Sequence, residues 1–130
     1  LETKGITVLG YNTDEFPAFF TPKSGLAVAH RADTPAEVAS ILKAKWGLGL
    51  EGGVLVANPV PEDMGFDAAE ATDQALREAQ SQGVEGKALT PFLLKHIADS
   101  TEGKSLAANV ALVKHNARIG ARISVAYAAS

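Results

Sequence analysis

The sequence predicts an α/β fold in which helices cover a mostly parallel sheet. Two short apolar runs, at 5–11 and 53–58, have the length and β-branched content of buried strands. A helical pattern lies between them, and a strand, helix, strand order favours a parallel crossover. Strands that are apolar along their whole length are covered on both faces, so we expect an α/β/α layered architecture.

The segment between these two strands divides into a loop and a helix. Residues 12–25 are expected to be irregular, because turn residues and a proline interrupt them. Thr34 can cap a helix, Pro35 suits its first position and Glu37 completes a capping box. Gly47 then ends the helix.

Three further helices are predicted after the second strand. The first covers about 67–82 and is followed by a glycine suited to a helix C-terminus. Thr90 and Pro91 repeat the pattern of a cap followed by proline, and predict a short helix. The Ala-rich stretch 105–127 predicts one long helix, with Ser105 as its cap. Two strands are too few for an independent sheet covered on both faces, so this helix-rich segment is expected to be incomplete alone.

Composition limits the class of protein. The chain has 130 residues, no cysteine and a net charge of −3, which argues against disorder, a disulfide scaffold, thiol chemistry and a nucleic-acid partner. No apolar run is long enough to suggest a membrane span, and a cytoplasmic location is expected. The chain opens at Leu1 without a methionine. We therefore expect the chain to be a segment of a longer protein.

Two glycine motifs resemble nucleotide-binding sequences but lack the required context. Residues 47–52 fit G-x-G-x-x-G, yet a helix precedes them and a strand follows, the reverse of a dinucleotide site. Residues 103–105 look like the end of a phosphate-binding loop, but Ala98 stands where its first glycine is needed. A helix stop and a helix start are the favoured interpretations, although a helix beginning at Ser105 could also attract an anion.

Polar residues on the last helix form two groups. Asn109 and Asn116 are seven residues apart and share a face, although asparagine is unfavourable inside a helix. They could present amides to a polar ligand or hydrogen bond to a neighbouring loop. Lys114, Arg118 and Arg122 form a stripe on another face, for which solvent or a subunit contact is favoured over an anion site.

Other titratable residues give no pattern typical of catalysis. His30, His96 and His115 lack the spacing of metal ligands. Asp14 and Glu15 are adjacent in an extended segment, so their side chains should point to opposite sides and not act on one atom. No nucleophile lies beside a base in the sequence.

Long and specific sequence motifs nevertheless point to one enzyme family. The most specific motifs are TDEFPAFF and GGVLVANPVPE. Shorter motifs accompany them, and all occur in the same order as in the family. The segments concerned are 10–20, 24–25, 46–62, 86–94 and 105–113. Together they resemble the C-terminal part of the pseudouridine-5′-phosphate glycosidases, over almost the whole chain. The resemblance implies that residues 1–130 are the C-terminal segment of a single, longer domain.

The resemblance implies a reaction and its requirements. These enzymes reversibly cleave the C–C glycosidic bond of pseudouridine 5′-phosphate, giving uracil and ribose 5-phosphate. They use a lysine Schiff base, a glutamate proton donor and a divalent metal, usually Mn²⁺, and they assemble as homotrimers. The family carries these groups in its N-terminal part, so we expect them upstream of Leu1 and no metal ligand in this segment.

The resemblance also assigns roles on the last helix. The asparagine of the family motif S-x-x-x-N-x-x-L-V corresponds to Asn109, which is implied to hold the substrate. Ser105 and Asn116 are expected nearby as substrate-binding residues. The family commonly has two asparagines just after the motif. In this sequence His115 and Asn116 occupy those two positions, so the role of His115 stays open.

Two other functions remain open. The first is a C-ribosylating synthase that joins ribose 5-phosphate to another aromatic acceptor. The second is a structural piece without catalytic activity of its own. The residues that would separate these functions are expected mostly upstream.

Overall fold

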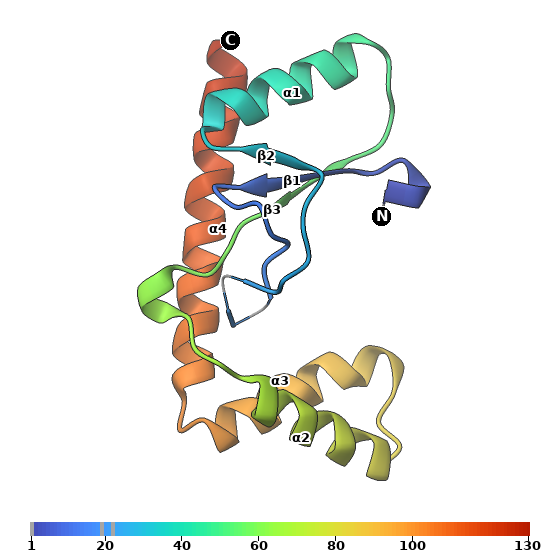
Figure 1. The fold of residues 1–130 in the computed structure, drawn as a ribbon, viewed down its shortest axis with the longest axis vertical. Coiled ribbons are helices and arrows are strands. Elements are labelled where there is room, and N and C mark those ends of the chain that lie inside the picture. The colour runs from blue at the N-terminus through green and yellow to red at the C-terminus, as the bar shows by residue number, and fades with distance from the viewer. Residues whose placement is uncertain (1, 19, 22) are drawn as a thin grey trace.

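Three parallel strands and four α-helices make up most of the structure (Figure 1). It is a computed structural model that describes residues 2–18, 20–21 and 23–130, without the side chain of Glu2. The elements are β1 (Thr7–Tyr11), β2 (His30–Ala32), α1 (Pro35–Gly47), β3 (Val54–Ala57), α2 (Ala69–Ser81), α3 (Leu89–Ser100) and α4 (Lys104–Ala129). Short 3₁₀ helices cover Glu2–Lys4, Glu62–Met64 and Gly86–Ala88. Among the described helices, none has the length and apolar character needed to cross a bilayer.

The sheet has the order β2-β1-β3, with β1 parallel to both neighbours. Leu9 marks the register, since it is opposite His30 on one side and Val56 on the other. The two strands predicted from apolar runs are thus confirmed, together with their parallel pairing. Strand β2 was not predicted, because its sequence His-Arg-Ala has no apolar pattern.

Helix α1 begins as its sequence predicts. The Thr34 side chain accepts a hydrogen bond from the Glu37 backbone N–H (3.2 Å), and the Glu37 carboxylate accepts one from the Thr34 N–H (3.1 Å). This capping box satisfies amides that the first turn leaves without partners. The helix then packs Val38 into a core cluster with Leu9 of β1 and Ile119 of α4.

The other face of β1 is approached by the loop between β1 and β2. A Cβ atom at Gly10 would collide with the Thr13 carbonyl oxygen and lie 2.8 Å from Val28 Cγ2. Glycine is therefore required for this loop to pack against the strand. As expected, the described residues of this loop form no regular element apart from one isolated bridge between Glu15 and Ala27.

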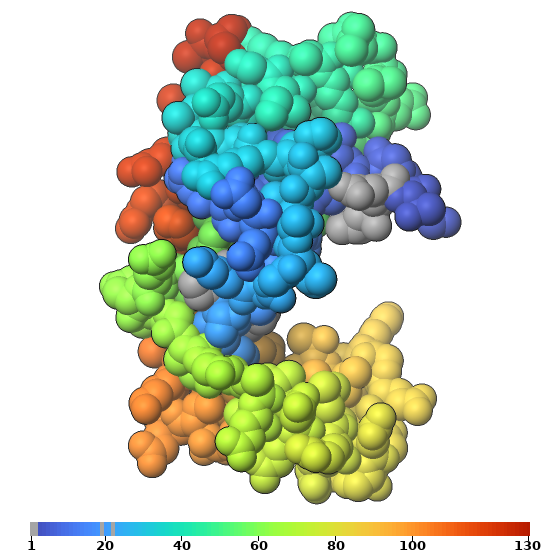
Figure 2. All heavy atoms as spheres, viewed as in Figure 1, coloured from blue at the N-terminus to red at the C-terminus, as the bar shows by residue number. Residues whose placement is uncertain are grey.

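A second core lies away from the sheet, where α2 and α3 pack together. Phe20 from the loop packs against Phe66, with ring centroids 5.1 Å apart, and joins Ile97 of α3 and Ala108 of α4 in one cluster. Helix α4 runs along the whole molecule and contributes to both cores (Figure 1). The space-filling view shows a broad notch between the sheet and the α2–α3 pair (Figure 2).

Two predicted helix caps are wrong. Helix α4 begins at Lys104 after Gly103, whose φ of 81° forms the tight turn from α3, so Ser105 lies inside the first turn and is only 3% exposed. Helix α3 follows directly from the 3₁₀ turn Gly86–Ala88, so Thr90 lies within the helix and caps nothing. In both cases the preceding turn determines where the helix starts.

Candidate functional site

Helix α4 carries the predicted substrate-binding residues on one side. Seven residues turn an α-helix by nearly two full turns, so Asn109 and Asn116 lie within about 20° of each other around its axis. The Asn116 Oδ1 accepts a hydrogen bond from Asn58 Nδ2 at 2.8 Å. Asn58 directly follows β3, so for Asn116 the structure supports the interpretation of a hydrogen bond to a neighbouring loop.

Asn109 has a different environment. It is half-buried, and its side chain forms no hydrogen bond with another described residue. Ser105 lies one turn earlier on α4 and is buried. A half-buried amide without a partner can bind a polar group of a ligand at little desolvation cost. Substrate contacts by Asn109, Asn116 and Ser105 remain predictions.

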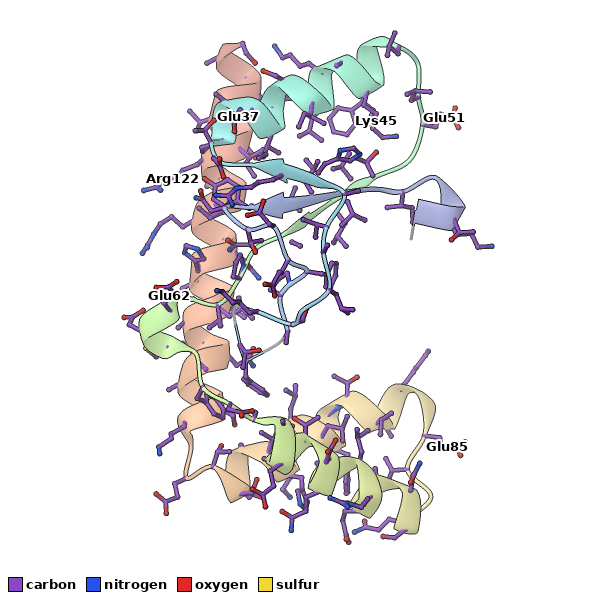
Figure 3. The ribbon with its side chains drawn as sticks, in the orientation of Figure 1. Glu37, Lys45, Glu51, Glu62, Glu85 and Arg122 are labelled. Carbon is purple, nitrogen blue, oxygen red and sulfur yellow. The ribbon has the colours of Figure 1, made fainter. Side chains whose placement is uncertain are left out.

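A polar cavity opens at the carboxyl ends of β1 and β3, and we call it the strand-end cavity. Its volume is about 370 Å³. Its lining is Tyr11–Thr13, Lys23, Asn58–Glu62, His115, Ile119 and Arg122. Figure 3 shows Glu62 and Arg122 on the same side of α4. Ligands of open parallel sheets bind outside the carboxyl ends of the strands, so the position is typical of a binding site.

Sequence reasoning missed most of this cavity. It interpreted Arg122 as part of a solvated stripe and did not consider Asn58 or Lys23. One usable signal was present, because Asn58 ends a buried parallel strand and must lie at the carboxyl edge of the sheet. The approach of Lys23 to α4 depends on the path of an irregular loop, which no local pattern indicates.

The carboxylates of Asp14 and Glu15 form hydrogen bonds with residues in or beside the loop. Asp14 forms a salt bridge with Arg31 (2.5 Å), which also contacts Asp33 (2.6 Å). The hydrogen bonds that the Arg31 guanidinium donates to Asp33 and then to Asp14 raise the pKa of Arg31 above its ordinary value. The Glu15 carboxylate instead accepts hydrogen bonds from the Ser24 and Gly25 amides. The two carboxylates therefore bind different partners within the described residues.

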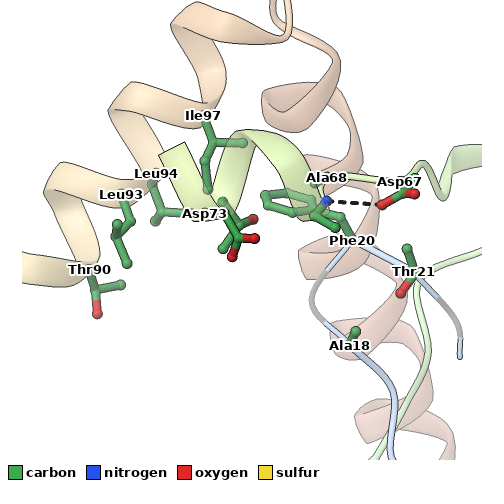
Figure 4. Close-up of a pocket in the computed structure, with 12 residues that line it drawn as sticks. Ala18, Phe20, Thr21, Asp67, Ala68, Asp73, Thr90, Leu93, Leu94 and Ile97 are labelled. Atoms are coloured by element: carbon green, nitrogen blue, oxygen red, sulfur yellow. Dashed lines mark hydrogen bonds between the residues drawn. The ribbon is translucent and has the colours of Figure 1, made fainter. Parts of the chain in front are cut away.

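A second, mainly apolar pocket of about 400 Å³ lies between the loop and the α2–α3 pair (Figure 4). Phe20, Leu93 and Ile97 supply apolar surface, and Asp67 and Asp73 also line the pocket. Asp67 Oδ1 accepts a hydrogen bond from the Ala69 amide at 2.9 Å, so its carboxylate helps to start α2. The lining suits an apolar side chain better than a phosphate.

The described residues do not fit the metal that the resemblance implies. Across the described part of the chain, no group of three or more histidine, aspartate or glutamate side chains could hold a metal ion. Mn²⁺ prefers several carboxylate and water oxygens, which a single acid such as Glu62 does not supply. A metal site therefore requires ligands other than those described.

Comparison with curated proteins gives consistent matches. Residues 1–126 match the family described as indigoidine synthase A like protein. The pseudouridine-5′-phosphate glycosidase of Caldanaerobacter subterraneus subsp. tengcongensis is 55% identical over 96% of this chain and 42% of its own length. The enzyme of the same name from Lysinibacillus sphaericus is 53% identical, again over 96% of this chain and 42% of its own.

Solved structures share the fold. The prealnumycin C-glycosynthase AlnA, in complex with ribulose 5-phosphate, has a TM-score of 0.86 and 32% identity, covering 99% of this chain and 43% of its own. An indigoidine synthase A-like protein from Thermotoga maritima has a TM-score of 0.85 and 39% identity, covering 96% and 42%. The chain thus spans well under half the length of these relatives. The predicted resemblance to pseudouridine-5′-phosphate glycosidases is confirmed, and the chain belongs to the indigoidine synthase A-like protein family.

Proposed function

We propose that this chain is one part of an enzyme that reversibly cleaves the C–C glycosidic bond of pseudouridine 5′-phosphate. The products are uracil and ribose 5-phosphate. The observation that carries the proposal is the 55% and 53% identity to glycosidases of that name over 96% of the chain. The chain spans 42% of those enzymes. In the proposal, the rest of the active site comes from a part that precedes this chain.

The chemistry explains why the chain needs that part. A C–C glycosidic bond has no leaving oxygen that an acid could protonate. A lysine that forms a Schiff base with the opened sugar provides an electron sink instead. A glutamate supplies the proton to the departing nucleobase. In the proposal both groups, and any metal ligands, belong to the N-terminal part of the domain, and the assembly is a homotrimer.

Within this division, helix α4 supplies a substrate contact. The half-buried Asn109 amide has no partner among the described residues, so it can donate to and accept from a nucleobase or sugar. Its position on a long helix packed into two cores keeps it rigid, which favours precise orientation of the substrate.

A C-ribosylating synthase is the second candidate. The likeness to the prealnumycin C-glycosynthase, at a TM-score of 0.86, favours it, although the identity of 32% is lower than that to the glycosidases. The two candidates differ in the acceptor. Ribose 5-phosphate with uracil should give product in the first case, and ribose 5-phosphate with a larger aromatic acceptor in the second.

The experiment is a uracil-release assay on three samples. The 130-residue chain alone, the N-terminal part alone and the two together are incubated with pseudouridine 5′-phosphate. We expect no turnover from either part and turnover from the mixture or from a single polypeptide that contains both. Uracil release by the 130-residue chain alone would overturn the division of labour, and no release from the complete enzyme would overturn the proposed reaction.

A further inference from the structure

The two faces of the sheet differ in what covers them. Leu9 and Val56 point to the face on which α1 and α4 pack. Val8 is paired with Leu55 in the register of β1 and β3, so these two side chains lie on the opposite face. That second face is approached by the loop between β1 and β2 (Figure 1). One face is thus covered by helices and the other by a loop.

An apolar groove of about 330 Å³ lies on the second face, and we call it the sheet-face groove. None of the described α-helices contributes a residue to its lining. Leu26 lines it and is 66% exposed, while Phe16 in the lining and Leu55 on the same face are exposed as well. Parallel strands are usually covered on both faces, so this apolar surface is typical of a helix-docking face. The full lining is Thr3, Val8, Phe16 and residues 26–29.

Hydrogen bonds hold the loop side of the groove in place. The Phe16 backbone N–H donates to the Leu26 carbonyl at 2.7 Å. The Glu15 carboxylate accepts hydrogen bonds from the Ser24 and Gly25 amides, at 3.1 and 2.8 Å. The groove is therefore formed before anything docks, and little conformational entropy is lost when it is filled.

The N-terminal turn identifies what fills the groove. Residues Glu2–Lys4 form one helical turn, and Gly5 follows it with a φ of 70°. A helical turn with a lysine, followed by a glycine in the left-handed conformation, is typical of the C-terminus of a helix. Thr3 of this turn also lines the sheet-face groove. A helix that ends at this turn would therefore consist of residues before Leu1 and would lie along the groove.

The connection of the strands also indicates where such a helix comes from. Helix α1 joins β2 to β3 across β1, on the covered face. Crossovers between parallel strands nearly always have the same hand, so a helix on the opposite face must cross the sheet in the opposite direction. A helix that leads into β1 on that face therefore starts from a strand beyond β3. The sequence of β3, Val-Leu-Val-Ala, is apolar throughout, which suits a strand with neighbours on both sides.

We propose that the sheet-face groove is the docking surface for an amphipathic helix formed by the residues directly before Leu1, and that this helix follows a parallel strand on the β3 side of the sheet. The proposal rests on the proposed function in one respect, namely that a preceding part continues the chain. Strand β1 has five residues and is about 17 Å long, so a helix that runs back along it needs about 11 residues. Its apolar side covers Leu26, Phe16 and Leu55.

The test is disulfide scanning of the protein in its full natural length, with any native cysteine replaced. Leu26→Cys is combined in turn with a cysteine at each of about 15 positions before Leu1. We expect intramolecular disulfides at positions three or four residues apart, because one side of the helix faces the groove. Leu48→Cys is the matched control, since Leu48 is 77% exposed and lies outside the groove. It should form no disulfide with these positions.

Two results would overturn the docking helix. One is the absence of a disulfide with Leu26→Cys at every position. The other is a disulfide between two chains, which would identify a second copy as the occupant. Both are read from non-reducing gels, without an activity assay. Failure of the complete enzyme to release uracil would therefore count against the proposed reaction and leave the docking result standing.

Hydrogen exchange resolved to single residues tests the neighbouring strand in the same full-length protein. We expect the consecutive amides of Val54–Ala57 all to exchange about 100-fold or more slowly than unfolded peptide, as in the central strand β1. In an edge strand, alternate amides point away from the sheet and have no strand partner. Fast exchange at every second residue of β3 would overturn the placement of a strand beside it.

Discussion

Asn109 and Asn116 share one side of α4 but make different interactions. The Asn116 amide is occupied by Asn58, which explains why an asparagine is tolerated inside the helix there. The Asn109 amide is half-buried and forms no hydrogen bond within the described part of the chain. The spacing alone made the two residues look equivalent, and only the position of the loop after β3 distinguishes them.

Replacing Asn109 tests its role in catalysis. In the complete enzyme we expect Asn109→Ala to lower kcat/KM by about 10- to 1000-fold, the range for one lost polar contact to a transition state. Steady-state uracil release measures the effect. Lys114→Ala, at an exposed position on the opposite side of α4, serves as the control and should retain activity. An unchanged kcat/KM in Asn109→Ala would show that the residue is structural.

Among the elements, the two Thr-Pro sequences show how far local patterns determine structure. Thr34 caps α1 through a complete capping box, whereas Thr90 lies inside α3 and caps nothing. The sequences are alike, but a 3₁₀ turn leads directly into α3 and provides its first turn. A cap motif therefore predicts a helix near its position, and the preceding backbone determines the first residue.

This pair provides a matched stability experiment. Thr34→Ala should lower the free energy of unfolding by about 1 kcal/mol, since it leaves an amide at the start of α1 without its partner. Thr90→Ala removes the same side-chain atoms where no cap exists, and should change stability by less than about 0.5 kcal/mol. Urea unfolding followed by circular dichroism measures both. Equal losses in the two variants would contradict the importance of the capping box.

Much of the fold, but little of the site, could be predicted from the sequence. Strands β1 and β3 and helix α1 follow from patterns within a few residues. Strand β2 exists because His30 and its neighbours pair with β1, which is an interaction distant in sequence. The strand-end cavity joins Lys23 to Arg122 through the folded sheet, so its composition has no local signal.

At the scale of the whole molecule, α4 carries several apolar side chains that are exposed to solvent. Leu106, Val113 and Val125 are exposed by 59%, 61% and 70%, respectively. Apolar patches of this kind on a soluble protein commonly mark contact surfaces.

Exposure of apolar surface can be followed with a hydrophobic dye. We expect the 130-residue chain alone to bind 8-anilinonaphthalene-1-sulfonate and to lose most of this fluorescence when the N-terminal part of the enzyme is added, because association buries apolar surface. The N-terminal part alone and an unrelated soluble protein serve as controls. Unchanged fluorescence in a mixture that releases uracil would show that the apolar residues are not covered by the proposed assembly.

The contribution of α4 to both core clusters affects the thermal unfolding of the protein. Ala108 belongs to the core cluster beside α2 and α3, and Ile119 belongs to the core cluster that includes Leu9 of the sheet. Because α4 contributes to both clusters, the loss of either cluster would expose part of the apolar side of α4 to water, which is unfavourable. We therefore expect the two clusters to unfold together, as one cooperative unit, on heating.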